Sequence, residues 1–153
     1  MRITRYTDYS VRVLIYLGVK NDGALATIQE IADRYGISKN HLMKVVHDLQ
    51  LRGYIDTIRG KNGGIRLRLQ PERINIGRLI RDTEQDMTLV ECFGPGNNCI
   101  ITPFCDLKHV LNEALEAFFK VLDGYTLADL LKPERRPGLE RMLGVGEIPV
   151  VVE

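Results

Sequence analysis

The sequence has no long hydrophobic run and no apolar segment at its start, and these absences limit where the protein works. No stretch approaches the roughly 18 consecutive apolar residues that a membrane-spanning helix needs. Residues 1–8 are polar and basic and lack the apolar region of a secretory signal. With 44% hydrophobic and 27% charged residues over 153 positions, we expect a soluble, cytoplasmic protein built from a small domain and an extension.

Groups of residues that would serve catalysis are also missing. No nucleophile with an evident base and acid is present, and the glycine-rich residues 60–64 fit a hairpin better than a phosphate-binding loop. We therefore expect that the protein is not an enzyme.

Cysteine is scarce, and its three copies, Cys92, Cys99 and Cys105, lie within fourteen residues. An odd number argues against a disulfide framework. The segment is rich in Gly, Pro and Asn, which is typical of a loop. Thiolates clustered in a loop bind soft metals or iron–sulfur clusters, or act as a redox switch. A structural zinc site is a weaker alternative, because it needs four nitrogen or sulfur ligands and only three are evident.

The net charge of +1 hides two halves of opposite charge. Residues 1–70 carry 12 Lys/Arg against 6 Asp/Glu, and residues 71–153 carry 9 against 14. A basic N-terminal half suits a polyanionic partner, and an acidic half should face away from one. Uneven surface charge alone is the simpler alternative.

Residues 27–69 predict a winged helix-turn-helix. Thr27 and Glu30 have the spacing of a capping box at the start of one helix. After a turn at Gly36, Ser38 is placed to cap a second helix, which Gly53 ends. Its apolar residues recur at helical spacing: Leu42, Val45, Val46 and Leu49.

A basic hairpin follows, and we interpret it as the wing. Residues 54–58 and the alternating residues 65–69 predict two strands, and Asn62-Gly63 between them is a strong hairpin signal. Recognition helices place N-terminal polar residues against base edges, and wings reach phosphates or the minor groove. We therefore expect DNA contacts from Ser38, Lys39, Asn40, His41, Lys44, Arg59, Lys61 and Asn62.

Two further helices are predicted in the N-terminal part. One covers residues 8–20, with Thr7 or Asp8 as its cap and Val11, Leu14, Ile15 and Leu17 on its inner face. The other covers residues 76–83, with Ile76, Leu79 and Ile80 inward.

Thr102-Pro103 predicts the start of a long C-terminal helix. Its apolar residues form a heptad seam and an adjoining second stripe. One stripe suits the helix's own domain and the other a second copy of the chain, so we expect a homodimer. The seam is Phe104, Leu107, Leu111, Ala114, Phe118 and Val121; the second stripe is Val110, Leu115, Phe119 and Leu122.

The expected fold class is mainly α with a small β-wing, in four parts. Residues 1–84 form the winged helix-turn-helix domain, and residues 85–101 form the cysteine loop. Residues 102–132 form the dimerisation helix and a short last helix that Thr126 starts, and residues 133–153 form a loosely ordered tail.

Four segments resemble the Rrf2 family of bacterial transcription regulators, and most closely its nitric-oxide-sensing repressors. They are Met1-Arg-Ile-Thr-Arg-Tyr-Thr-Asp-Tyr9, Arg59-Gly-Lys-Asn-Gly-Gly-Ile-Arg-Leu67, Cys99-Ile-Ile-Thr-Pro-Phe-Cys-Asp-Leu-Lys108 and Leu122-Asp-Gly-Tyr-Thr-Leu-Ala-Asp-Leu130. The resemblance spans about residues 1–131. It implies a homodimer that binds double-stranded operator DNA and holds one iron–sulfur cluster per subunit, 4Fe–4S in preference to 2Fe–2S.

The same resemblance implies the ligands. Cys92, Cys99 and Cys105 would be the thiolates, and Asp8 of the partner subunit the fourth ligand. Other members use a His three residues after the third cysteine, where this chain has Lys108. The remaining candidates are His109, Glu84, Asp86 and Glu91.

The implied function is a repressor that releases DNA when nitric oxide reacts with its cluster. Within the class, the rivals are a regulator that responds to iron or cluster supply and a cluster-free thiol switch. An electron carrier or cluster scaffold is the rival from another class, and it leaves the basic wing without a purpose.

Overall fold

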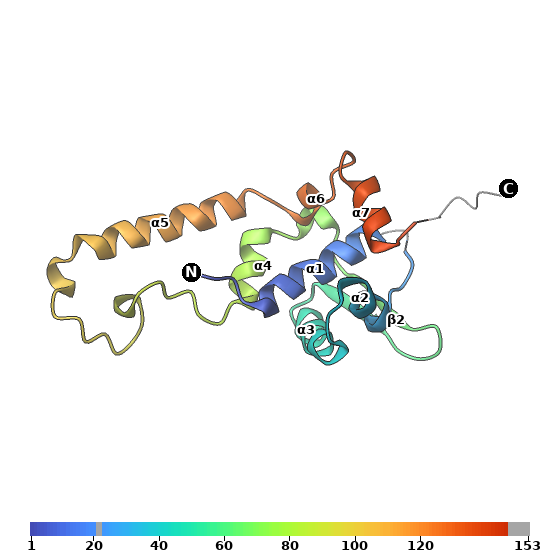
Figure 1. Cartoon of the computed structure of the whole chain (residues 1–153), viewed down its shortest axis with the longest axis horizontal. Helices are drawn as coiled ribbons and strands as arrows, with labels where there is room; N and C mark the ends of the chain where they lie inside the picture. Colours follow the sequence, from blue (N-terminus) through green and yellow to red (C-terminus); the bar gives the residue numbers. More distant parts are fainter. Residues whose placement is uncertain (21–22, 147–153) are drawn as a thin grey trace.

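The computed structural model describes residues 1–20 and 23–146 as a helical body from which one long helix extends (Figure 1). The predicted fold class, mainly α with a small β-wing, is confirmed. No helix in the described residues is long and apolar enough to cross a membrane. The elements are α1 (Arg5–Val19), α2 (Ile28–Tyr35), α3 (Lys39–Leu51), β1 (Ile55–Ile58), β2 (Gly64–Leu67), η1 (Pro71–Arg73), α4 (Ile76–Thr83), η2 (Glu91–Phe93), η3 (Thr102–Phe104), α5 (Asp106–Asp123), α6 (Leu127–Leu130) and α7 (Arg136–Leu143).

Helix α1 lies at the centre of the body. It begins at Arg5, three residues before the predicted start, because Thr4 and neither Thr7 nor Asp8 is its cap; the Thr4 hydroxyl accepts a hydrogen bond from the Thr7 backbone N–H at 3.3 Å. The helix contacts α3, α4, α6, α7 and β2. Since neighbours surround it, its buried set is wider than the single predicted face and includes Val13, Leu14, Tyr16 and Leu17, whereas Val11 and Ile15 are only half-buried.

Helices α2 and α3 form the predicted helix-turn-helix. Thr27 and Glu30 make both hydrogen bonds of the capping box, and Gly36 ends α2 with a left-handed φ of 63°. Ser38 occupies the N-cap position of α3, but its side chain makes no capping hydrogen bond. The four predicted apolar residues of α3 are all buried.

Strands β1 and β2 form the antiparallel hairpin, with Ile58 opposite Gly64. Asn62 adopts φ of 65°, the left-handed conformation that a tight turn of this kind requires. Gly63 is needed for a different reason, because a Cβ there would overlap the carbonyl oxygens of Ile58 and Gly60. Ala26 bridges to Ile65, which ties the base of the wing to the segment before α2.

The C-terminal half of α5 packs on α4. Phe119 is buried against Ile76 and Ile80. Arg81 stacks on the Phe119 ring at 4.1 Å and its guanidinium donates to both carboxylate oxygens of Asp123, at 2.6 and 2.9 Å. The N-terminal half of α5 extends away from the body, with the cysteine loop at its far end (Figure 1).

The predicted start of α5 is wrong by three residues. Thr102-Pro103 begins only a short 3-10 turn, η3, and the backbone then becomes extended at Cys105 (φ −93°, ψ 106°). The long helix restarts at Asp106, so Cys105 is its N-cap residue and does not lie in its first turn.

The chain after α5 returns to the body. A capping box at Thr126 and Asp129 starts α6, as predicted. The expected loosely ordered tail is wrong for residues 136–143, which form α7 and place Leu143 in the main core. The Arg136 guanidinium also donates to the Val19 carbonyl at 2.8 Å, at the end of α1. Residues 147–153 of that predicted tail lie outside the described residues.

Candidate functional site

The predicted DNA-reading side chains lie at the surface of two neighbouring elements. Ser38, Lys39, Asn40, His41 and Lys44 are all exposed in and just before the first turns of α3, while its apolar face is buried. Arg59, Lys61 and Asn62 are exposed in the hairpin. Figure 1 shows α3 and this hairpin on the same side of α1. Exposed basic residues of α3 and of the hairpin therefore belong to elements on the same side of the body.

Two residues of α1 adjoin that surface and were missed in the sequence. Arg5 and Tyr9 line a small cavity together with His41 and Lys44. The rings of Tyr9 and His41 lie 6.3 Å apart, tilted by 51°. The available signal was weak, because a basic residue at a helix start has no distinguishing spacing to residues of another helix.

The three cysteines come together around one cavity of about 310 Å³. Cys92 comes from η2, Cys99 from the loop and Cys105 from the N-cap of α5, and all three thiols are free. Glu91 and Lys108 also line this cavity. Its apolar lining residues are Val90, Ile101, Leu107 and Leu111. In residues 1–20 and 23–146, no three side chains of His, Cys, Asp or Glu are placed to hold a single metal ion.

Polar side chains hold the cysteine loop in shape. The Asn97 carboxamide oxygen accepts from the Cys99 backbone N–H at 3.0 Å, and the Thr102 hydroxyl donates to the Cys99 carbonyl at 2.8 Å. Asn97 also donates to the Thr102 hydroxyl at 2.8 Å. Within the same loop, a Glu91 carboxylate oxygen accepts a hydrogen bond from the Asn98 backbone N–H at 2.8 Å. These bonds fix Cys99 relative to the segments on both sides of it.

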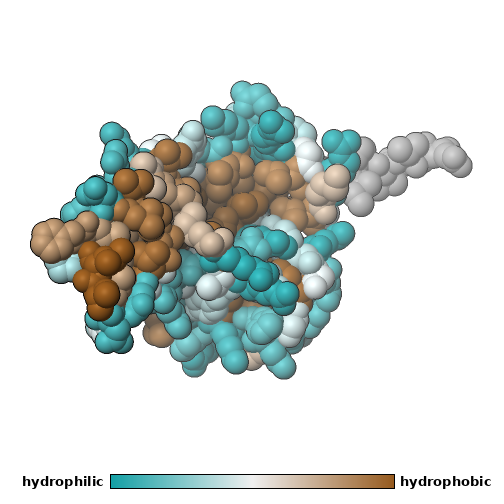
Figure 2. Space-filling model, turned by 60° about the vertical axis from the view of Figure 1, so that its left-hand side comes forward, coloured by the Kyte–Doolittle hydropathy of each residue, from teal (hydrophilic) through white to brown (hydrophobic). Residues whose placement is uncertain are grey.

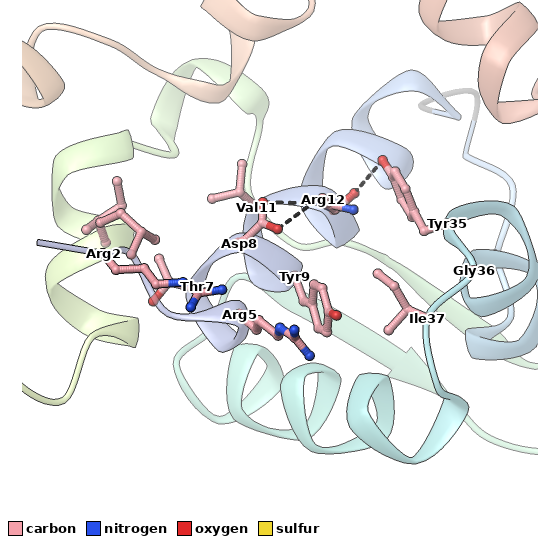
Figure 3. A pocket seen from close by; sticks show the side chains of 12 residues that line it. Arg2, Arg5, Thr7, Asp8, Tyr9, Val11, Arg12, Tyr35, Gly36 and Ile37 are labelled. Carbon is pink, nitrogen blue, oxygen red and sulfur yellow. Dashed lines mark hydrogen bonds and ion pairs between the residues drawn. The ribbon is translucent and has the colours of Figure 1, made fainter.

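Asp8 does not line the cysteine cavity of its own chain. It lies on α1 in a different hollow of about 770 Å³ (Figure 3), where its carboxylate forms an ion pair with Arg12 at 2.7 Å. Arg12 in turn lies near the Tyr35 ring, and the Tyr35 hydroxyl donates to the Arg12 carbonyl at 3.0 Å. Burial raises the pKa of Tyr35 to about 12, so this hydroxyl stays protonated and keeps donating at neutral pH.

The other candidate fourth ligands differ in position. Glu84 accepts hydrogen bonds from the N–H and hydroxyl of Thr4 at 2.7 and 3.0 Å, which anchors the start of α1 to the end of α4. Asp86 accepts from the hydroxyl and N–H of Thr88, and these bonds lower the pKa of its carboxyl. His109 shares a second cavity, of about 680 Å³, with Cys92. Of the four alternatives, only Glu91 lines the cavity of all three thiols.

The α5 surface has two unlike stripes. In the second stripe Phe119 is buried and Leu115 and Leu122 are half-buried against α4. Most of the heptad seam faces outward, with Phe104 94% and Leu107 60% exposed. Val121 of the seam is exposed too, and Ile100, Ile101 and Val110 add further exposed apolar side chains. Figure 2 shows hydrophobic residues gathered on the side of the molecule where the arm comes forward.

Comparisons with known proteins agree with this architecture. A family model described as Rrf2, an iron-dependent transcriptional regulator, matches residues 3–133. The chain belongs to the Rrf2 family. Its members regulate transcription, so the expectation that this chain is not an enzyme is confirmed, and DNA binding by this Rrf2 protein is supported.

Curated Rrf2 relatives match along most of their length. The chain is 61% identical to the HTH-type transcriptional regulator NsrR of Bacillus licheniformis over 132 residues, which cover 86% of this chain and 92% of that protein. It is 58% identical to NsrR of Bacillus subtilis over 133 residues, covering 86% and 91% of the two proteins.

Solved structures show the same fold. IscR of T. potens has a TM-score of 0.70 and 25% identity, covering 88% of each chain. The oxidised form of CymR from Staphylococcus aureus has a TM-score of 0.70 and 27% identity, covering 86% of this chain and 97% of that one.

Proposed function

We propose that this chain is a homodimeric transcriptional repressor that holds one iron–sulfur cluster per subunit and releases DNA when nitric oxide reacts with that cluster. The observation that carries the proposal is the single cavity that Cys92, Cys99 and Cys105 share, in a protein with a DNA-reading domain. The similarity to NsrR regulators and to IscR supports it. A cytoplasmic location suits both the DNA target and three thiols kept reduced.

The residues around the cavity fit such a cluster. Three thiols from separate segments line the cavity as soft ligands, and within the described residues they are not placed around a single ion, which suits a cluster of several iron atoms better. Apolar side chains, Val90 and Leu111 among them, form part of the cavity wall beside the thiols. Lys108 also lines the cavity and would balance part of the negative charge of a thiolate-bound cluster.

The fourth ligand is proposed to be Asp8 of the partner subunit. Asp8 is separate from the cysteine cavity of its own chain and lies at the surface of a hollow on α1. The two subunits would meet along the exposed seam of α5, which leaves Phe104 and Leu107 uncovered in one chain. Burying such side chains stabilises an interface by about 25 cal/mol per Å² of apolar surface.

Ligation by Asp8 would link the reaction of nitric oxide at the cluster to the DNA-binding helices. When bound, an iron–sulfur cluster supplies iron that coordinates nitric oxide in place of its weaker protein ligands, and a carboxylate is a weaker ligand there than a thiolate. Asp8 belongs to α1, and α1 packs directly on α3. Release of Asp8 would therefore free α1, with the recognition helix behind it, from the partner's cysteine loop.

The test compares DNA binding of three forms of the protein. A duplex is first selected from a random-sequence library with anaerobically purified, cluster-loaded protein. Loaded protein should bind that duplex, and nitric oxide should weaken binding by roughly 5- to 150-fold, the usual range of coupling between two sites. A response to cluster removal but not to nitric oxide would instead identify a regulator of iron or cluster supply. Recovery of no duplex at all would refute the DNA-binding role.

The role of Asp8 is tested separately. Asp8→Ala should change the absorption and circular dichroism spectra of the loaded protein and weaken the nitric oxide response, while Asp33→Ala, which removes a carboxylate from α2, should do neither. An Asp8→Ala protein that keeps its spectra, its DNA affinity and its full response would exclude the proposed link.

A further inference from the structure

Helix α1 places a basic residue beside the recognition helix. Arg5, the first residue of α1, lines a cavity of about 110 Å³ with His41 and Lys44 of α3. Tyr6, Tyr9 and Val45 form the rest of the wall. In Figure 3, the Arg5 and Tyr9 side chains extend from α1 on the side where α3 lies. Groups far apart in the sequence thus converge at one small concave site.

The cationic side chains at this site have no acidic partner among the described residues. Asp8, on the same helix as Arg5, and Asp48, on the same helix as Lys44, already have other partners: Asp8 pairs with Arg12 at 2.7 Å and Asp48 with Arg52 at 2.7 Å. Among the described residues, Arg5 and Lys44 form no ion pair. Two cations and an imidazole therefore face solvent around a hollow without a carboxylate in its wall.

Aromatic side chains form part of the wall. The Tyr9 ring lies 6.3 Å from that of His41 and 5.7 Å from the guanidinium carbon of Arg12. Tyr6 also lines the cavity, and burial together with a hydrogen bond to Asp48 raises its pKa to about 12. The Tyr6 phenol is therefore neutral at physiological pH and adds no negative charge that would repel an anion.

We propose that Arg5 binds a DNA backbone phosphate in this hollow, next to the bases that α3 reads. The inference rests on the DNA-binding role proposed above and adds α1 to the helix-turn-helix and the wing as a third contact element. Arginine suits the position because its guanidinium offers several donors to a phosphate. Such a contact fixes the angle of α3 in the major groove without reading sequence.

The predicted signature is a change in salt dependence. Each phosphate neutralised contributes about 0.9 to the slope of log affinity against log salt on duplex DNA. A dimer has two copies of Arg5, so Arg5→Ala should reduce the slope by nearly 2 and weaken binding on the order of tenfold or more at 0.1 M salt. The loss should be equal on the selected duplex and on a scrambled duplex of the same length.

Two further variants make the test specific. Arg5→Lys keeps the charge and should retain most of the slope. Lys132→Ala removes an exposed cation near α6, which lies across α1 from α3 (Figure 1), and should leave the slope unchanged. A wild-type slope in Arg5→Ala, or an equal reduction in Lys132→Ala, would overturn the inference while leaving the repressor proposal intact. If the wild-type protein binds neither duplex, it is the repressor proposal that fails.

Discussion

The DNA-reading body and the cysteine-bearing arm are stabilised in different ways. In the body, helices from both ends of the chain surround α1, and side chains such as Leu14, Leu42 and Leu79 are fully buried. In the arm, residues 85–115 include no fully buried side chain, while Phe104 and Ile100 are more than nine-tenths exposed. A region with so much uncovered apolar surface is incomplete alone, because monomeric proteins rarely leave such surface in water. The body is thus formed within one chain, whereas the arm is the region to which we assign the proposed cluster and the contact with a second subunit.

Removing a cysteine should give the largest effect, a loss of bound iron, without changing the fold of the body. Cys99→Ser replaces a thiolate with a poor ligand for iron, so the iron content of anaerobically purified protein should fall close to zero. Because Cys99 is exposed, far-UV circular dichroism and the melting temperature of the metal-free protein should not change. Iron analysis beside thermal melts checks both. Ser10, a buried residue of the body, gives the control Ser10→Ala, which should keep its iron. Full iron in Cys99→Ser would contradict the ligand assignment.

A charge on the heptad seam should separate the subunits. Leu107→Glu places a carboxylate on the exposed apolar stripe, where burial without a partner is strongly unfavourable. The mass in solution should fall from dimer to monomer in sedimentation or light scattering. Ala117→Glu, at an exposed position of the same helix outside both stripes, is the matched control and should remain dimeric. If both variants stay dimeric, the subunits meet elsewhere.

Truncating a buried side chain in the body should lower the free energy of unfolding, whereas truncating an exposed side chain in the arm should not. Leu14→Ala empties a fully buried site and should lower the free energy of unfolding by about 2–5 kcal/mol. In a monomeric Leu107→Glu background, Phe104→Ala should change it by less than about 0.5 kcal/mol, as expected for a surface substitution. Urea denaturation of the metal-free proteins measures both. Equal losses would show that the arm packs within its own chain.

The smallest expected effect lies at the junction between body and arm and concerns the pKa of Asp123. The Arg81 guanidinium hydrogen-bonds to Asp123 and lowers the pKa of that carboxyl in the folded state. A depressed folded pKa contributes stability that is present above the unfolded pKa and is lost as pH falls through the folded one. Arg81→Ala should return the Asp123 pKa toward its ordinary value, measurable by NMR titration of the side-chain carboxyl. An unchanged pKa would contradict the pairing.

Local signals predicted much of the body. The capping box at Thr27 and the turn at Asn62 depend on neighbouring residues, and both formed as predicted. Thr4 was missed as the cap of α1, since Thr7 and Asp8 carry the same kind of signal. The start of α5 was misplaced because Pro103 does begin a helical turn, but Cys105 interrupts it.

Contacts between distant segments escaped prediction. Pro137 would break a helix in its interior, but it occupies the first turn of α7, where proline is tolerated. Arg136 bonds to Val19 across 117 positions, and no local pattern reports such a contact. In the candidate site, the short spacing of the three cysteines indicated that they act together, whereas the position of Arg5 beside α3 could be known only from the fold.

The most direct test of the proposed cluster-holding dimer is a native mass spectrum of protein purified without oxygen, because it reports subunit number and bound mass together. The proposal predicts a dimer carrying two 4Fe–4S clusters, one per subunit, and a cluster-free spectrum for the Cys99→Ser protein. A dimer with two 2Fe–2S clusters would keep the proposal and change only the cluster type. An intact chain that carries zinc, or no metal at all, would contradict the proposal and leave a structural metal or a thiol switch at the cysteine cavity.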